Sequence, residues 1–264
     1  MSPEVTGAAD GLQLAVRAQH LSKAYNTQDG RVLAVDDINF EIADREFVAI
    51  VGPSGCGKTT ILKVLAGLVT PSSGEVEVFG QLLRGPPGVG MVFQAPVLLK
   101  WRSVLDNVLF PIEILHKKKS AYREQAVETL RLVGLQGFEN RYPWQLSGGM
   151  QQRVAIARAL IHDPKLLLMD EPFGALDQIT REQMNLELLR IWSETHKTTV
   201  LITHSISEAV FLADHVIVMT PRPGRIAGIL DVVLPRPRSS DTKFSPDFIA
   251  AVQEVERLIG IAVA

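Results

Sequence analysis

The segment Gly52-Pro53-Ser54-Gly55-Cys56-Gly57-Lys58-Thr59-Thr60 is the most informative stretch of this chain. Two of its glycines flank four residues and are followed by a lysine and a threonine, which is the pattern of a phosphate-binding loop. The loop follows Phe47–Val51, a short apolar run typical of a strand, and it leads into Thr60–Leu68, whose pattern predicts a helix. That order of strand, loop and helix is the context in which the motif binds phosphate.

The residue types of this phosphate loop (residues 52–60) explain its chemistry. Glycines let backbone N–H groups close around phosphate oxygens, and the N-terminus of the following helix adds positive potential. Lys58 can reach the β- and γ-phosphates, and the hydroxyl of Thr59 is placed to bind Mg²⁺. A glycine-rich turn that binds nothing is the alternative, but such a turn needs neither the lysine nor the hydroxyl. The segment therefore predicts binding of a nucleoside triphosphate.

Cys56 allows two interpretations. It lies at a helix start close to Lys58, where a thiolate is favoured, so alkylation could block ATP binding and ATP could protect the thiol. Alternatively, it is a small buried residue that fills space and does not react. Cys56 is the only cysteine among 264 residues, so no intrachain disulfide can form, which fits a reducing compartment.

The composition narrows the class of protein. Hydrophobic residues make up 46% and charged residues 21% of the chain, as in a globular protein. The formal net charge of −2 gives no reason to expect nucleic-acid binding. No apolar run is long enough to cross a bilayer, and the N-terminus lacks a basic segment followed by a long apolar core. We therefore expect any membrane role to come through a partner.

The pattern of the chain predicts an α/β fold, with a parallel core that a helical insert interrupts. Residues 1–11 are small and polar and are expected to be flexible. Alternation over Leu12–Phe47, with a turn at Gln28-Asp29-Gly30, predicts antiparallel strands, and Glu75–Phe79 and Val89–Phe93 predict two more. Gly85-Pro86-Pro87-Gly88 reads as a break between elements.

Helical periodicity dominates the middle of the chain, about residues 95–160. Three short, continuously apolar runs follow, which are typical of parallel strands covered on both faces, with helical Arg181–His196 between the first two. The runs are Lys165–Met169, Thr199–Thr203 and His215–Thr220. A last helix is predicted over about residues 245–260. We read Leu234–Ser240 as solvated surface rather than a binding site.

Asp170 and Glu171 follow the apolar run Leu166–Met169 directly. Carboxylates at the carboxyl end of a buried strand lie where ligands bind in open α/β sheets. Asp170 is expected to hold Mg²⁺, directly or through water, and Glu171 to orient and polarise the attacking water. An ordinary strand-end carboxylate is the alternative for each.

A second candidate site for an anion is the start of a helix at Leu146-Ser147-Gly148-Gly149. Ser147 is a plausible N-cap, and the glycine pair leaves backbone N–H groups uncovered at the positive end of the helix dipole. One nucleotide does not need two such helix starts from one subunit, so this one is expected to serve the nucleotide of another subunit. On local physics alone, a capped amphipathic helix is an equally good interpretation.

The whole set of motifs resembles the ATP-binding subunits of ABC transporters. The set comprises the phosphate loop, Gln94, Leu146–Gly149, Leu166–Pro172, Gly174-Ala175-Leu176-Asp177 and His204, in that family's order and spacing. The resemblance extends from about Leu14 to Leu234. It implies a P-loop NTPase core with a parallel sheet, an N-terminal antiparallel β subdomain and an inserted α-helical subdomain. It also implies that residues 12–264 form a single ABC-type ATP-binding domain.

The resemblance implies a role for each matching residue. Tyr25 matches the aromatic residue that stacks on adenine, while Gly52–Thr60 surrounds the phosphates. Gln94 resembles the glutamine that reaches Mg²⁺ and the attacking water. Ser147, Gly148 and Gly149 resemble the signature that clamps the γ-phosphate of the opposite subunit, and Asp177 the acidic residue of the dimer seam. His204 resembles the histidine that contacts the γ-phosphate and holds Glu171.

Two stretches are most similar to the nitrate, sulfonate and taurine importers of that family: Phe93–Asn107 and Val218–Arg225. Lys100 departs from the proline expected before Trp101, and it either tunes docking to membrane helices or reflects neutral drift.

The resemblance also implies the setting in which the chain works. The expected cofactors are ATP and Mg²⁺. The expected partners are a second copy of the chain, integral permease subunits and a solute-binding protein, with the chain on the cytoplasmic side of the membrane.

Three rival functions remain open. The first is an ABC protein that acts on ribosomes or DNA, although such proteins usually carry tandem ATPase domains or a long coiled coil. The second is an exporter ATPase of similar architecture. The third is a regulatory subunit that binds ATP without hydrolysis, against which Glu171, His204 and Gln94 argue.

Overall fold

The computed structural model describes residues 13–28, 30–85 and 88–263. The flexible segment predicted for residues 1–11 lies outside these residues, as do Asp29 of the predicted turn and residues 86–87 of the predicted break. The chain divides into two compact units. Unit 1 comprises the chain before residue 88, Thr198–Leu234 and the residues from Pro246 onward, and unit 2 comprises Gly88–Lys197 and Pro235–Ser245.

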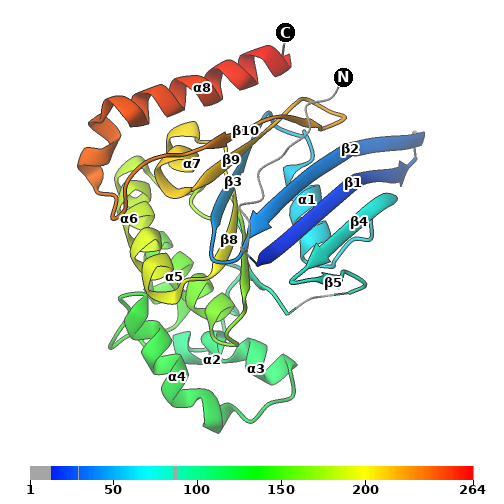
Figure 1. Ribbon diagram of the computed structural model, residues 1–264. Coiled ribbons are helices and arrows are strands. Elements are labelled where there is room, and N and C mark those ends of the chain that lie inside the picture. The colour runs from blue at the N-terminus through cyan, green and yellow to red at the C-terminus, as the bar shows by residue number, and fades with distance from the viewer. Residues whose placement is uncertain (1–12, 29, 86–87, 264) are drawn as a thin grey trace. The chain divides into compact units, whose positions relative to one another are not determined.

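Unit 1 contains the predicted antiparallel sheet, with strand order β2-β1-β4-β5 (Figure 1). Its strands are β1 (Leu14–Thr27), β2 (Gly30–Ala43), β4 (Ser73–Val78) and β5 (Gln81–Leu82). Alternation places Val16 and Ala18 of β1 on one face, where both are buried. Leu21 is buried as well, beyond a register shift that follows Ala18. The prediction of antiparallel strands before the phosphate loop is confirmed.

Unit 1 also contains four strands in the order β10-β9-β3-β8. The strands are β3 (Phe47–Val51), β8 (Thr198–Ile202), β9 (His215–Met219) and β10 (Ile226–Asp231). Strand β3 runs parallel to β8 and β9, whereas β10 is antiparallel to β9. Every residue of β3 and β8 is buried, which is why these strands read as continuous apolar runs.

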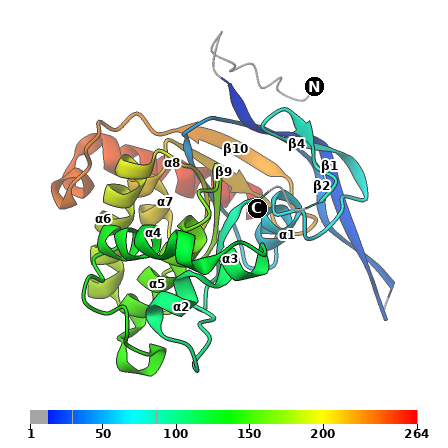
Figure 2. The same ribbon diagram turned by 90° about the horizontal axis from the view of Figure 1, so that it is seen from below.

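The helices of unit 1 are α1 (Lys58–Leu65), α7 (Ile206–Leu212) and α8 (Pro246–Val263). Helix α8 packs against α7, β9 and β10, and both ribbon views show it beside α7 and β10 (Figures 1 and 2). Helix α1 ends sooner than predicted, because Gly67 adopts a positive φ of 66° and its N–H bonds the carbonyl of Val64 at 2.9 Å.

Unit 2 pairs two parallel strands and carries most of the helices. Strand β6 (Gly90–Val92) lies beside β7 (Leu166–Asp170). The helices are α2 (Val104–Val108), α3 (Phe110–Ile114), α4 (Lys119–Leu132), η1 (Pro143–Gln145), α5 (Gly148–Leu160), α6 (Gln178–Thr195) and η2 (Ser240–Phe244). The predicted helical character of residues 95–160 is therefore present.

The segment Pro235–Ser245 belongs to unit 2 although the residues before and after it belong to unit 1. The guanidinium carbon of Arg236 lies 4.1 Å from the ring centroid of Trp192, and Lys243 Nζ lies 3.9 Å from a carboxylate oxygen of Glu182. Arg238 is only 6% exposed. The reading of residues 234–240 as solvated surface was wrong for Leu234 and Arg238, which are buried, and for Arg236, which packs against α6. The other four residues of this stretch are exposed.

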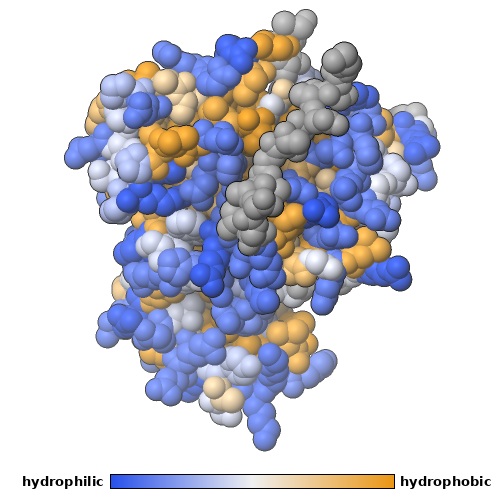
Figure 3. Space-filling view, in the orientation of Figure 1, coloured by the Kyte–Doolittle hydropathy of each residue, from blue (hydrophilic) through white to orange (hydrophobic). Residues whose placement is uncertain are grey.

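Among the described residues, no helix combines the length and apolarity required to span a bilayer. The face drawn in Figure 3 is largely hydrophilic, with apolar residues in separate patches.

Candidate functional site

The phosphate loop connects β3 to α1 within unit 1, as the sequence predicts. Gly57 is the N-cap of α1 and has a left-handed backbone, with φ of 106°. A Cβ atom at this position would lie 2.5 Å from Val35 Cγ1 and 2.8 Å from the carbonyl oxygen of Ala34. Both its conformation and its surroundings therefore require glycine at the turn into the helix.

Lys58 is buried, with 5% of its surface exposed. Its ammonium group donates hydrogen bonds to the carbonyl oxygens of Gly52 at 2.9 Å and Pro53 at 3.0 Å. These bonds hold the start of the loop against the first turn of α1. The positive charge of Lys58 is thus fixed inside the loop that the motif assigns to phosphate.

Cys56 of the phosphate loop is fully buried, and its thiol lies 3.9 Å from Lys58 Nζ. The Cys56 N–H donates to the carbonyl of Pro53 at 3.4 Å, which closes a tight turn. Burial of the thiol favours the interpretation of Cys56 as a packing residue over that of an accessible nucleophile.

Tyr25 and His204 both lie in unit 1 with the phosphate loop. The Tyr25 hydroxyl is 3.5 Å from Thr60 Oγ1, and the ammonium of Lys23 lies 5.3 Å from the centroid of the Tyr25 ring. His204 follows β8, whose residue Ile202 is in register with Ile50 of β3. The phosphate loop and His204 therefore leave neighbouring parallel strands at the same edge of the sheet, where α/β proteins bind ligands.

The residues that hold the backbone around His204 were not predicted from the sequence. Thr203 donates a hydrogen bond from its hydroxyl to the buried carboxylate of Glu208, and the same hydroxyl accepts from the Ser205 N–H at 3.1 Å. Ser205 Oγ in turn accepts from the Glu208 N–H at 3.2 Å, as the N-cap of α7. The signal for this helix start was present, since Ser205 and Glu208 have the Ser-x-x-Glu spacing of a capping box.

In unit 2, Gln94 and Glu171 both lie close to Gly174. A Cβ atom at Gly174 would be 3.4 Å from Gln94 Nε2, 3.4 Å from the carbonyl oxygen of Glu171 and 3.7 Å from its Cβ. The Gly174 N–H also donates to the Glu171 carbonyl at 3.1 Å. Asp170 closes β7 immediately before Glu171. The structure therefore brings together the three unit 2 residues that were predicted to act on Mg²⁺ and water.

Glu171 adopts a positive φ of 48°, which is unusual for a residue other than glycine. Such conformations cost about 1–3 kcal/mol and are concentrated at functional sites. Glu171 is half-buried. Its backbone turns abruptly at the end of β7, where a site that binds ligand beyond the strand is expected.

The predicted N-cap at Ser147 is confirmed, because its Oγ accepts from the Met150 N–H at 3.3 Å. Ser147 and Gly148 are exposed, whereas Gly149 is buried, and a Cβ atom there would be 3.0 Å from Thr180 Cγ2. The second glycine of the pair thus permits close packing between α5 and α6.

Asp177 is the N-cap of α6, and its carboxylate accepts from the Thr180 N–H at 3.0 Å and from the Thr180 hydroxyl at 2.7 Å. The bond from the Thr180 N–H is the main cause that lowers the pKa of Asp177. Thr180 therefore contacts both the signature glycine Gly149 and the acidic residue predicted for the dimer seam.

The residues predicted to bind Mg²⁺ supply a hydroxyl from Thr59, an amide from Gln94 and a carboxylate from Asp170. Mg²⁺ prefers such oxygen donors and usually keeps water and substrate phosphates among its ligands. Within the described part of the chain, no group of three or more His, Cys, Asp or Glu could hold a metal. The donor set thus fits a metal bound jointly with a nucleotide.

Asn107 organises the loop that leads into α2. It is fully buried, accepts from the Leu99 N–H at 2.7 Å and donates to the carbonyls of Leu99 at 3.1 Å, Arg102 at 3.2 Å and Ser103 at 2.9 Å. Trp101 is nevertheless 73% exposed. Lys100 beside it is exposed too. A rigid loop therefore presents a large aromatic side chain to solvent.

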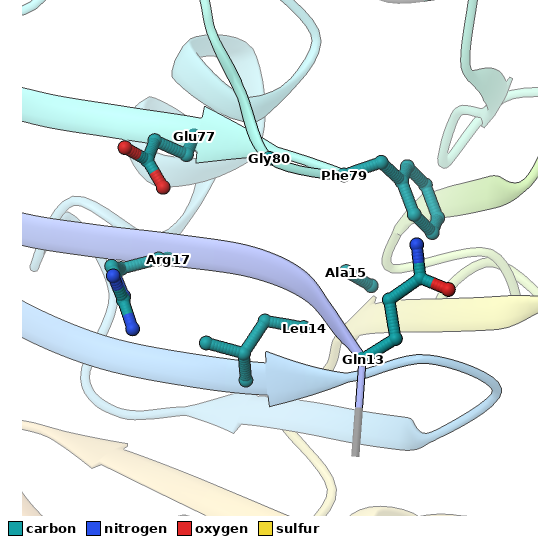
Figure 4. A pocket seen from close by; sticks show the side chains of 7 residues that line it. All are labelled: Gln13, Leu14, Ala15, Arg17, Glu77, Phe79 and Gly80. Carbon is teal, nitrogen blue, oxygen red and sulfur yellow. The ribbon is translucent and has the colours of Figure 1, made fainter. Parts of the chain in front are cut away.

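A pocket of about 300 Å³ lies elsewhere in unit 1, along β1 and β4 (Figure 4). Arg17 within it bonds Glu41 at 2.8 Å. None of the predicted site residues lines this pocket, whose lining is Gln13, Leu14, Ala15, Arg17, Glu77, Phe79 and Gly80.

The chain is similar in sequence and in structure to proteins of one known family. A family model described as ABC transporter matches residues 35–174. An uncharacterized ABC transporter ATP-binding protein of Methanocaldococcus jannaschii is 48% identical over 87% of this chain and 86% of its own length. The taurine import ATP-binding protein of Rhizobium johnstonii is 43% identical over 92% of this chain and 96% of its own length. A solved dimeric bacterial ABC transporter cassette has a TM-score of 0.72 at 32% identity and covers 83% of this chain and 100% of its own.

The chain belongs to the ABC transporter family, as an ATP-binding subunit with ATPase activity. The predicted fold class, an α/β P-loop NTPase with an N-terminal antiparallel sheet, is confirmed. The roles of the individual site residues stay predictions.

Proposed function

We propose that this chain is the ATP-hydrolysing subunit of a membrane importer of a small solute, and that two copies enclose two ATP molecules head to tail. The main support is the presence of two separate helix starts suited to phosphate, at Lys58 and at Ser147, in a chain whose relatives include a dimeric cassette. Each nucleotide is held by Lys58 and Thr59 of one subunit and by Ser147–Gly149 of the other.

The proposed chemistry divides between binding and hydrolysis. Lys58 and the N–H groups of the phosphate loop bind the phosphates, and Tyr25 stacks on the adenine. Glu171 orients and polarises the attacking water, Gln94 lies beside it, and His204 contacts the γ-phosphate. When bound, Mg²⁺ neutralises charge on the phosphates, and Thr59, Gln94 and Asp170 are the residues that would hold it.

The dimer is proposed to open and close with the nucleotide. The γ-phosphate attracts two positively polarised helix starts, so ATP stabilises the closed dimer and hydrolysis removes that attraction. Permease subunits that bind residues 94–107 would then change between two conformations as the dimer opens and closes. The rigid loop held by Asn107, with Trp101 exposed, supports this surface as the one that meets the permease.

The solute class is proposed from the relatives. Taurine import ATP-binding proteins of Pelagibacter ubique and Rhizobium johnstonii are 49% and 43% identical to the chain. We therefore propose small sulfonates or similar anions as cargo, delivered by a solute-binding protein to permease subunits, with this chain on the cytoplasmic side.

The decisive experiment compares Glu171→Gln with the wild-type chain. Loss of the carboxylate should slow ATP hydrolysis by about two to four orders of magnitude while ATP binding persists, so that dimers accumulate with Mg-ATP. ATPase rate and dimer fraction by light scattering are the measurements, and Glu124→Gln, at an exposed position in α4, is the control. Normal turnover in Glu171→Gln would remove Glu171 from its proposed role.

A further inference from the structure

The loop Thr220–Arg225, singled out in the sequence as part of an importer-like stretch, lies against the phosphate loop within unit 1. Gly224 is its contact point. A Cβ atom at Gly224 would overlap the carbonyl oxygen of Cys56 and would lie 2.8 Å from Met219 Cε. Since the φ of Gly224 is not in the left-handed region, space rather than backbone conformation requires glycine here.

The other side of Gly224 is joined to β2. Its N–H donates to the Ala34 carbonyl at 3.0 Å, and its carbonyl accepts from the Asp36 N–H at 2.9 Å. These two bonds form a parallel bridge with Val35. The backbone of Gly224 is thus clamped between β2 and the middle of the phosphate loop.

Two further interactions fix the loop that carries Gly224. Thr220 accepts the Arg225 N–H on its hydroxyl at 2.9 Å, and its own N–H donates to the Arg225 carbonyl at 2.9 Å. The Arg225 guanidinium forms an ion pair with Asp36 of β2. The loop is therefore closed on itself and tied to the same strand as Gly224.

The end of β9 leaves no room for a side chain at Gly52, the first residue of the phosphate loop. A Cβ atom at Gly52 would lie 2.9 Å from the Met219 carbonyl oxygen and 3.0 Å from Met219 Cβ. Met219 is the last residue of β9, immediately before Thr220. One continuous segment, Met219–Gly224, thus supports both Gly52 and Cys56.

We propose that Gly224 is a positioning residue for ATP binding. Because it has no side chain, the Cys56 carbonyl can pack directly against its backbone, and this contact fixes the position of the phosphate loop. This inference rests on the proposed role of the phosphate loop. A side chain at Gly224 pushes on the loop backbone, so the N–H groups that surround the phosphates lose their alignment. The residues that act on the attacking water are not in this contact, so affinity for ATP suffers more than the rate at saturation.

The test uses the full-length chain and a fluorescent methylanthraniloyl derivative of ATP, together with steady-state ATPase kinetics. Gly224→Ala should weaken nucleotide affinity and raise KM about tenfold or more, with kcat changed less than about threefold. Gly228→Ala is the matched control, because the three atoms nearest to a Cβ there all belong to the flexible side chain of Leu258, the first at 3.0 Å. Its affinity should equal that of the wild type.

Two further variants keep the test decisive. Lys58→Ala tests the phosphate loop itself, and if it still binds nucleotide, the proposed site fails irrespective of Gly224. Should Gly224→Ala not fold, Arg225→Gln removes the ion pair without adding bulk and should weaken affinity in the same direction, whereas Arg225→Lys should retain it in part. Unchanged affinity in folded Gly224→Ala, unchanged affinity in Arg225→Gln, or an equal loss in Gly228→Ala would overturn the inference.

Discussion

Thr203 and Glu208 are joined by a hydrogen bond from the threonine hydroxyl to a buried carboxylate. His204, the histidine proposed to contact the γ-phosphate, follows Thr203 directly in the sequence. Because the Thr203 hydroxyl also accepts from the Ser205 N–H at 3.1 Å, both neighbours of His204 are tied to the first turn of α7. We therefore predict that Glu208 acts by positioning His204, in the role proposed for that histidine, rather than by contacting ATP.

Glu208→Ala should lower kcat about tenfold or more while the KM for ATP changes little, because the Thr203 hydroxyl loses its acceptor and the backbone on either side of His204 is no longer held. Glu208→Gln keeps an amide oxygen that can accept the same bond, so it should retain most of the activity. Glu208→Ala should in addition lower the free energy of unfolding by about 1–3 kcal/mol, since the Thr203 hydroxyl loses its buried partner. ATPase kinetics and urea denaturation measure the two effects, with Glu256→Gln on the exposed face of α8 as the control. A Glu208→Ala enzyme with wild-type kcat would contradict this role.

Ser147→Asp separates capping of α5 from binding to the opposite nucleotide. Aspartate caps helices as well as serine does, so the melting temperature should stay close to that of the wild type. Its charge, however, would repel the γ-phosphate, and the ATP-induced dimer should disappear in a Glu171→Gln background. Light scattering with Mg-ATP reports the dimer, and Ser193→Asp, on the exposed surface of α6, is the control. Persistence of the dimer would show that Ser147 does not contact the second nucleotide.

His215 should make folding stability depend on pH. Glu46, with help from Asp231 at 2.7 Å, raises the pKa of His215 to about 9, and partial burial opposes the shift. Protonation is therefore favoured in the folded state. The resulting stabilisation is complete below the ordinary histidine pKa of about 6.5 and is lost as the pH rises through about 9.

Urea denaturation of the wild type and His215→Gln at several pH values between 6 and 10 measures this contribution. The difference in unfolding free energy should be largest at the acidic end and should shrink toward pH 10. His116→Asn, at an exposed position with a left-handed backbone that asparagine tolerates, should show no such trend. A difference that does not vary with pH would rule out the ion pairs as its source.

Cys56 should resist thiol reagents in the native protein, because its side chain is fully buried. Labelling with an aromatic disulfide reagent should be slow in buffer, should accelerate in urea in step with unfolding, and should be slowed by Mg-ATP only through stabilisation of the fold. Rapid labelling of the folded protein, blocked by ATP, would instead support the reactive thiolate that the sequence also allowed.

Most elements of the fold could be predicted from short sequence patterns. The phosphate loop, the buried strands and the N-cap at Ser147 were predicted correctly because each depends on residues close together in the sequence. Helix α7 and strand β10 were not predicted. Helix α7 is a seven-residue helix, too short for a clear period, and β10 is half-buried along most of its length, so its residues do not alternate sharply.

The contacts that support the site residues needed the structure. Gly224 reads in the sequence as one more Pro-Gly turn, and nothing local connects it to Cys56, from which it is separated by most of the chain. The buried packing of Arg238 was likewise hidden, because a run of prolines and arginines normally indicates solvated surface.

At Glu171, the residue that would best stabilise the fold differs from the residue that the proposed chemistry requires, because the backbone there is left-handed. Glycine would relieve this conformation, whereas alanine would retain its strain, so Glu171→Gly should unfold at a higher urea concentration than Glu171→Ala. Both lack the carboxylate proposed to polarise water. If stability alone decided the residue at this position, glycine would be favoured over any acid. The proposed catalytic role of the carboxylate would account for the presence of glutamate there.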